Sequence, residues 1–139
     1  SYKIKTDDFV FIDDYAHHPK EIDAVRDTIN EIYPDKKTTA VFQPHLFSRT
    51  KDFADEFATS LSKFDTVILL DIYPARELPI QGVSSKWLLD KINVKKKKLV
   101  TKDKLINTIL KIDNPVLVTM GAGDIDIEVN SITKTLQNA

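Results

Sequence analysis

Two short stretches of the chain concentrate side chains that commonly contact ligands. They hold all three histidines of the sequence, a pair of aspartates and one arginine. An arginine guanidinium binds a carboxylate or a phosphate through two parallel hydrogen bonds. We therefore expect a ligand site with an anionic partner. The side chains in question are Asp13, Asp14, His17, His18, His45 and Arg49.

Arg49 and a pair of glycines strengthen this expectation. Arg49 is expected in the first turn of a helix, where the helix dipole disfavours a cation, so it needs an anion, either from a ligand or from a nearby aspartate. Gly121 and Gly123 most simply form a tight turn from a strand into a helix. Such a turn also exposes backbone N–H groups to an anion, although the full G-x-G-x-x-G fingerprint is absent.

Each of these groups also has a purely structural interpretation. Asp13 is as well suited to a turn or a helix cap as to a ligand contact, whereas Asp14 is the better functional candidate. His17 and His18 are alternatively caps for the next helix through their ring nitrogens. We expect no metal site, because adjacent side chains on an extended turn point apart and the chain has no cysteine.

The elements that must position these residues alternate between strands and helices. We expect strands at 9–12, 38–42, 66–70, 99–100 and 116–120, because these runs are apolar without a period of two, and a further edge strand at 2–5. The expected fold is a three-layer, Rossmann-like α/β domain. Its mainly parallel sheet has five or six strands, with helices on both faces.

Apolar residues at helical spacing predict the helices between those strands. The first follows Pro19, which suits a first helical position. A charge run at 95–98 is expected to be a solvated turn, with phosphate binding as the minor alternative. Trp87 is expected in the core. The stripes are Ile22, Val25, Ile29 and Ile32; Phe53, Phe57, Leu61 and Phe64; Leu88, Leu89 and Ile92; Leu105, Ile106, Ile109 and Leu110; and Ile125, Val129, Ile132 and Leu136.

The polar segments follow four of the expected strands. They occupy 13–19, 43–50, 71–77 and 121–124. Parallel strands deliver their following loops to one edge of the sheet, which is where open α/β sheets bind ligands. We therefore expect a single site at this edge.

Composition limits the class of protein. The 139 residues suit one domain, and 42% are apolar and 29% charged, as in an ordinary globular protein. A net charge of −1 argues against a nucleic-acid partner. No apolar run approaches the roughly 20 residues that span a membrane, so we expect no membrane partner and a cytoplasmic location.

Five motifs, in order along nearly the whole chain, resemble the carboxy-terminal domain of the Mur ligase family. The first is shared widely in the family. The second and third are more specific to its alanine-adding members. The motifs are 13–19 (Asp-Asp-Tyr-Ala-His-His-Pro), 42–45 (Phe-Gln-Pro-His), 48–52 (Ser-Arg-Thr-Lys-Asp), 79–85 (Pro-Ile-Gln-Gly-Val-Ser-Ser) and 120–125 (Met-Gly-Ala-Gly-Asp-Ile).

The resemblance implies one part of a three-domain ligase that joins L-alanine to UDP-N-acetylmuramate. In that reaction ATP activates a carboxylate as an acyl phosphate, which the alanine amine attacks. The N-terminal domain would hold the UDP-sugar, and the central domain would hold most of the ATP together with Mg²⁺. The present chain has no G-x-x-x-x-G-K-[ST] loop, so residues 1–139 would be one Mur ligase domain and inactive alone.

The same resemblance implies ligand contacts, but no catalytic or metal-binding residue in this chain. Asp14 would lie near the ATP ribose. His45 and Arg49 would hold L-alanine and the charge of its carboxylate or of the acyl phosphate. The implied substrate contacts together are Tyr15, His17, His45, Arg49 and Arg76.

Two positions depart from the family pattern. Leu46 stands where many members have an arginine, so one cationic contact is missing or is supplied from elsewhere, with Arg76 as a candidate. The loop at 73–77 also lacks the glycine expected there. Both departures concern the expected alanine contacts and leave the five motifs of the resemblance unchanged.

Three alternative functions remain at this point. A ligase of the same superfamily that attaches a ready-made tripeptide shares the first motif. A receiver-like signalling domain would use Asp13, Asp14, Asp71 and Thr101, but it needs a lysine after the fifth strand, where Gly121 and its neighbours stand. A stand-alone binding module would also explain the missing phosphate loop.

Overall fold

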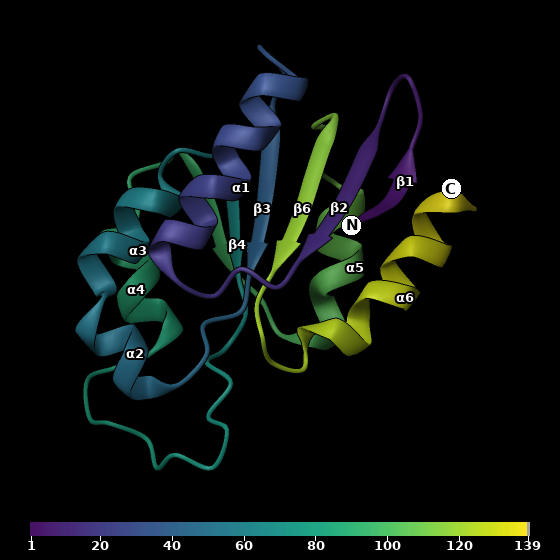
Figure 1. Cartoon of the computed structure of the whole chain (residues 1–139). Helices are drawn as coiled ribbons and strands as arrows, with labels where there is room; N and C mark the ends of the chain where they lie inside the picture. Colours follow the sequence, from purple (N-terminus) through teal and green to yellow (C-terminus); the bar gives the residue numbers. More distant parts are fainter. Residues whose placement is uncertain (139) are drawn as a thin grey trace.

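The structure is a computed structural model that describes residues 1–138. Within that range the chain forms three layers around one sheet, with helices α1 to α4 on one face and α5 and α6 on the other, as Figure 1 shows. The six strands lie in the order β1-β2-β6-β3-β4-β5. β1 pairs antiparallel with β2, and the other neighbours are parallel. The predicted Rossmann-like, mainly parallel α/β fold is confirmed.

The strands fall close to their predicted positions. The edge strand and the strands at 38–42 and 116–120 have the predicted bounds. The others shift by one to three residues. The observed strands are β1 (Tyr2–Lys5), β2 (Val10–Asp14), β3 (Thr38–Phe42), β4 (Thr66–Leu69), β5 (Lys96–Leu99) and β6 (Val116–Met120).

The charge run at 95–98 is exposed to solvent, as predicted, but most of it is a strand and not a turn. The lysines there form most of β5, the outermost strand, and their side chains are exposed. Lys97 Nζ donates to the carbonyl oxygens of Leu89 at 3.0 Å and Ile92 at 2.8 Å, which lie at the end of α4. Charged side chains on an edge strand hinder its pairing with a strand of another molecule, which explains why the lysines lie in β5.

The helices begin largely where the sequence places them. Pro19 is the first residue of α1, as predicted. The stripe from Phe53 to Phe64, however, is only partly helical. Phe53 separates two short helices and is 41% exposed, Phe57 and Leu61 lie in the second helix, and Phe64 follows it as a buried residue. The helices are α1 (Pro19–Ile32), α2 (Phe47–Asp52), α3 (Ala54–Leu61), α4 (Ser85–Lys91), α5 (Lys102–Leu110) and α6 (Ile125–Gln137).

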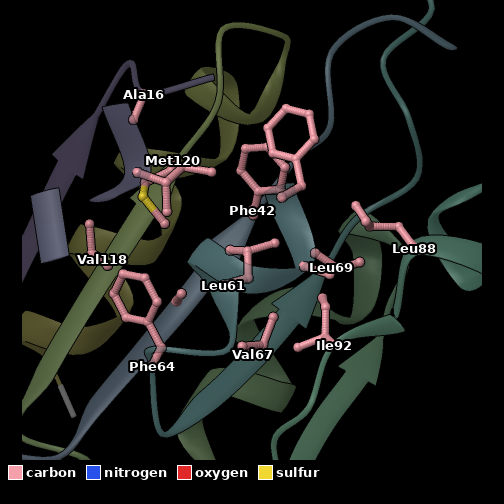
Figure 2. Packing of buried hydrophobic residues seen from close by; sticks show 14 of the residues in the cluster. Ala16, Phe42, Leu61, Phe64, Val67, Leu69, Leu88, Ile92, Val118 and Met120 are labelled. Atoms are coloured by element: carbon pink, nitrogen blue, oxygen red, sulfur yellow. The ribbon is translucent and has the colours of Figure 1, made fainter. Parts of the chain in front are cut away.

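The sheet separates two apolar clusters. The larger lies under α1, α3 and α4, and Figure 2 shows Phe42, Leu69 and Met120 from the strands packed against Leu61 and Leu88 from the helices. Trp87, which was predicted in the core, is half-buried and packs against the edge of this cluster instead of lying within it. The smaller cluster lies under α5 and α6. Its members include Phe11, Val41, Ile68, Leu105, Val129 and Ile132.

Two further residues of the helical stripes are exposed, Ile32 at 54% and Leu110 at 46%. Each is the last residue of its helix, α1 and α5 respectively. Each fully buried Leu, Ile or Phe contributes about 1.5–3 kcal/mol relative to exposure. Among residues 1–138, no helix is both long and apolar enough to cross a membrane.

Candidate functional site

The polar loops start at one level of the sheet. In the strand register Asp14 lies beside Met120, Met120 beside Phe42, and Phe42 beside Leu69. The last residues of β2, β6, β3 and β4 are therefore aligned. The loops that follow them leave the sheet at the same edge, at the bottom of Figure 1. The predicted common edge is confirmed.

Asp13 and Asp14 point to opposite faces of the sheet, since side chains alternate along a strand. Asp13 Oδ1 accepts from the Thr119 hydroxyl at 2.7 Å, and burial raises the pKa of its carboxyl group. Asp14 Oδ1 accepts from the N–H of Ala16 at 2.9 Å. Asp13 is thus engaged within the fold, whereas Asp14 lies at the start of the polar loop.

Glu21 caps α1. Its Oε1 accepts from the backbone N–H of His17 at 3.1 Å and of His18 at 3.0 Å, and these bonds lower the pKa of the Glu21 carboxyl. The ring of His17 lies instead with Nδ1 2.9 Å from the carbonyl oxygen of Tyr15. Tyr15 itself is 66% exposed at this edge. His18 is the N-cap residue of α1 and forms a capping box with Glu21, so the capping interpretation holds for His18 but not for His17, whose Nδ1 faces Tyr15.

His45 and Arg49 form a pair. Nη1 of Arg49 is 2.9 Å from Nδ1 of His45. The ring centroids of His45 and His17 are 6.3 Å apart, so loops 28 residues apart in sequence meet here. Burial first, then the charges of Arg49 and His17, lower the pKa of His45, while Glu77 acts in the opposite direction.

Tyr73 covers His45. The two rings are stacked with centroids 5.6 Å apart and planes 12° apart. The backbones join in an isolated parallel bridge: the N–H of Tyr73 donates to Pro44 at 2.8 Å, and the N–H of Leu46 donates to Tyr73 at 2.8 Å. Tyr73 could not be recognised from the sequence, because nothing in its spacing shows that it reaches a loop 28 residues upstream.

Glu77 fixes the start of α2. Its carboxylate accepts from the backbone N–H of Ser48 at 3.1 Å and from the Ser48 hydroxyl, and the hydroxyl bond is the largest cause of a lowered pKa for Glu77. Arg76, the neighbouring residue, lies exposed in a turn closed by a bond from the N–H of Glu77 to Pro74 at 2.9 Å. Within residues 1–138 no hydrogen bond or ion pair joins Arg76 to His45 or Arg49.

Gln43 and Asp124 connect the second loop with the last. Gln43 Nε2 donates to Asp124 Oδ1 at 2.6 Å, and Gln43 Oε1 accepts from the N–H of Ile125 at 2.9 Å. Lys102 donates to the other oxygen of Asp124. A cleft of about 470 Å³ opens beside this network and Tyr73. The available sequence signal for this network was a glutamine directly after an apolar strand, and the structure shows that this glutamine is buried.

Leu46 has an unusual backbone. Its φ is 72° and its ψ is 136°, a conformation that a branched side chain rarely adopts. Bonds at both sides hold it: its N–H donates to Tyr73, and its carbonyl accepts from the Thr50 hydroxyl at 2.8 Å. Strained residues of this kind concentrate at ligand sites, and here the strain lies beside His45.

The arrangement suits anions rather than metals. His17, His45 and Arg49 come together, and Tyr15 and Asp14 flank them in the same loop as His17. Among residues 1–138 no three His, Cys, Asp or Glu side chains form a cluster suited to a metal ion.

The chain matches a known family over most of its length. Residues 2–123 fit the model of the Mur ligase, glutamate ligase domain. It is 61% identical over 136 residues to UDP-N-acetylmuramate–L-alanine ligase of Flavobacterium psychrophilum and 62% identical over 136 residues to that of Christiangramia forsetii. Each alignment covers 98% of this chain but 30% of the relative.

Solved structures agree. UDP-N-acetylmuramate-alanine ligase from Thermotoga maritima superposes with a TM-score of 0.73 at 25% identity, over 94% of this chain and 27% of that one. A murein peptide ligase from Psychrobacter arcticus superposes with a TM-score of 0.71 at 19% identity, over 95% and 28%. The second likeness establishes the fold alone.

Proposed function

The chain belongs to the Mur ligase family, and we propose that it is the carboxy-terminal domain of a three-domain ligase that joins L-alanine to UDP-N-acetylmuramate. It spans about 30% of the length of the curated relatives that it matches. The N-terminal and central domains of that enzyme would be its partners. The proposed reaction consumes ATP, so we also propose a cytoplasmic location.

The observation that carries the proposal is the His45–Arg49 pair at the common edge, beside His17. A guanidinium matches a carboxylate with two parallel bonds, and positioning of this kind supplies much of the rate of a two-substrate reaction. We propose that Arg49 and His45 hold the carboxylate of L-alanine or the charge of the acyl phosphate. Tyr15 and His17 would line the boundary between the amino acid and the nucleotide.

Asp14 fits a contact to the ATP ribose. One of its oxygens accepts from Ala16, which leaves the other for hydroxyl groups. It also borders a groove of about 340 Å³ between β2 and α1, lined by Ile12, Val25 and Ile29 among others. Bound ATP would supply the phosphoryl group that activates the carboxylate, and Asp14 would orient its sugar.

The residues of this chain do not fit Mg²⁺. A magnesium site needs oxygen ligands in octahedral geometry, and the described residues hold no acidic cluster of that kind. We propose that the central domain holds the metal. Arg76, which lies exposed on its turn, would reach the alanine site only when the other domains approach this edge.

The relatives favour alanine addition over the alternatives. Those at 60% identity and above are named as L-alanine ligases, whereas the murein peptide ligase is 19% identical. Membership of a ligase family also sets aside the receiver-like domain.

Replacing Arg49 or His45 by alanine in the full-length enzyme tests the proposal. We expect kcat/KM for L-alanine to fall at least about tenfold, because a charge-assisted bond to the substrate is lost. Lys134→Ala, a change on an exposed position of α6, is the matched control and should leave kcat/KM unchanged. Unchanged kinetics in both site variants would remove this pair from the site. The isolated chain should show no ligase activity.

A further inference from the structure

The bond between Arg49 and His45 determines which nitrogen of the imidazole carries the proton. Nη1 of Arg49 lies 2.9 Å from Nδ1 of His45. A guanidinium has five N–H donors and no acceptor, and it stays protonated in proteins. Nδ1 must therefore be the acceptor. A neutral imidazole that accepts at Nδ1 carries its proton at Nε2.

Tyr73 holds the imidazole in the orientation that this bond needs. The stacked ring fixes the plane of His45, and Tyr73 is itself bonded to the His45 segment through Pro44 and Leu46. Behind Tyr73 lies Gly123, where a Cβ would come within 2.7 Å of the Tyr73 Cγ. Gly123 thus packs directly against the base of the Tyr73 side chain, and this contact limits the movement of the ring that stacks on His45.

The charges around His45 favour its neutral form. The groups that face it are Arg49 from α2, His17 from the first loop, and Glu77 and Tyr73 from the loop after β4. Arg49 and His17 oppose a positive charge on His45. Glu77 favours one, but its carboxylate is engaged by Ser48.

We propose that Tyr73 is a positioning residue that holds His45 as the neutral Nε2–H tautomer, and that His45 donates to an anionic oxygen of the substrate instead of acting as a general base. This proposal deepens the proposed ligase function and rests on it. Among residues 1–138, Nε2 has no hydrogen-bond partner, so its proton is available to the alanine carboxylate or the acyl phosphate. Because Nδ1 is occupied by Arg49 and Nε2 is protonated, a different group must take the proton from the alanine amine.

NMR of the chain tests the tautomer without any ligand. Long-range proton–nitrogen correlations of the ¹⁵N-labelled protein distinguish the protonated from the bare ring nitrogen of each histidine. We expect His45 to be neutral and protonated at Nε2 at about pH 7.5. Protonation at Nδ1, or an imidazolium at that pH, would overturn the proposal.

Variants of Tyr73 test the positioning role. Tyr73→Ala should mix the two tautomers of His45 and raise its titration midpoint, whereas Tyr73→Phe, which keeps the flat ring, should preserve both. Should the alanine variant fail to fold, Tyr73→Leu keeps most of the volume without the flat face. An unchanged His45 spectrum in a folded Ala or Leu variant would refute the role of Tyr73.

Kinetics of the full-length enzyme separate a donor from a base. His45→Gln keeps an N–H donor but has no basic nitrogen, so kcat/KM should stay within about tenfold of the parent while His45→Ala falls about tenfold further. Equal losses in the two variants would contradict the donor role. If the parent forms no amide from L-alanine, the ligase proposal fails, whereas the NMR result still decides the tautomer.

Discussion

At the scale of single residues, neighbouring aspartates have different environments. Asp13 is half-buried against Thr119, and burial raises the pKa of its carboxyl above the ordinary value. Asp14 starts the polar loop on the other face. The two environments differ because successive side chains of a strand point to opposite faces of the sheet. Asp13 can therefore be replaced without changing a residue of the proposed site.

Asp13→Asn should stabilise the fold at neutral pH. A carboxyl whose folded pKa is raised contributes stability that is complete below the unfolded pKa and is lost as the pH rises through the folded pKa. Asparagine keeps an oxygen for the Thr119 hydroxyl and carries no charge. Urea denaturation should therefore show a higher unfolding free energy than the parent at pH 7 and a smaller difference near pH 3.5.

Asp27→Asn on an exposed position of α1 serves as the control and should change little at either pH. A loss of stability in Asp13→Asn at pH 7 would show that the charged form is preferred in the fold.

The sequence predicted the meeting of His17, His45 and Arg49 better than it predicted the residues that pack against them. His17, His45 and Arg49 were found because their loops follow strands that end at one edge. Tyr73 and Gln43 were not, since their roles depend on how closely two loops approach one another. Side-chain contacts of that kind depend on tertiary packing, which leaves no periodic signal in the sequence.

At the scale of elements, the glycine turn after β6 controls how the loops pack. A Cβ at Gly123 would lie 2.6 Å from Gln43 Oε1 and 2.7 Å from Tyr73 Cγ, closer than real contacts. We expect Gly123→Ala to lower the unfolding free energy by about 1–3 kcal/mol through overpacking. It should also shift the NMR signals of His45, because Tyr73 is displaced.

Gly82→Ala is a control of a different kind. A Cβ at Gly82 meets nothing within 4 Å, but its φ of 81° disfavours any side chain. It should cost stability, by roughly 1–2 kcal/mol, while leaving the His45 signals unchanged. Equal spectral effects of the two changes would contradict the contact argument.

The turn at 74–77 contains backbone strain that can be relieved. Ala75 and Arg76 have φ values of 46° and 75°, although neither is glycine. We expect Arg76→Gly to raise the unfolding free energy by up to about 1 kcal/mol. A left-handed backbone costs roughly 1–2 kcal/mol at a residue with a side chain, and glycine avoids this cost. Glycine also increases the entropy of the unfolded chain, which offsets part of the gain. Lys111→Gly, at a φ of −87°, should instead destabilise. A less stable Arg76→Gly would mean that the arginine has an unrecognised contact.

Strands were easier to predict than the break between α2 and α3. The inner strands β3 and β6, for example, are continuous, mostly apolar runs rich in β-branched residues. The break at Phe53 has no proline or glycine to mark it. At the break the backbone N–H of Phe53 donates to the carbonyl oxygen of Arg49, and the N–H of Phe57 donates to that of Phe53. Helix propensity does not encode this local geometry.

At the scale of the whole molecule, both apolar clusters share one sheet. Leu105 lies in the cluster under α5 and α6, and Trp87 packs against the other. Because the four inner strands, β2, β6, β3 and β4, each contribute side chains to both clusters, we expect one cooperative unfolding transition. Trp87 fluorescence and far-UV circular dichroism should give the same urea midpoint.

Leu105→Ala should lower the stability reported by Trp87 by about 2–5 kcal/mol, even though the two residues lie on opposite faces. Leu78→Ala, at an 84% exposed position, is the matched control and should have little effect. A fluorescence transition that Leu105→Ala leaves unchanged would show that the two faces unfold independently.

The lysines of β5 also bear on how the protein behaves at high concentration. The outer side of β5 offers unpaired backbone groups, and a second molecule could extend the sheet there. Successive positive charges at Lys96, Lys97 and Lys98 would confront the same charges on an approaching copy. Exchanging Lys96 and Lys98 for threonine would remove two of these three charges and weaken the repulsion. We expect this variant to form intermolecular β-sheet and its solutions to become turbid. Added salt, which screens the charges, should promote the same assembly in the parent.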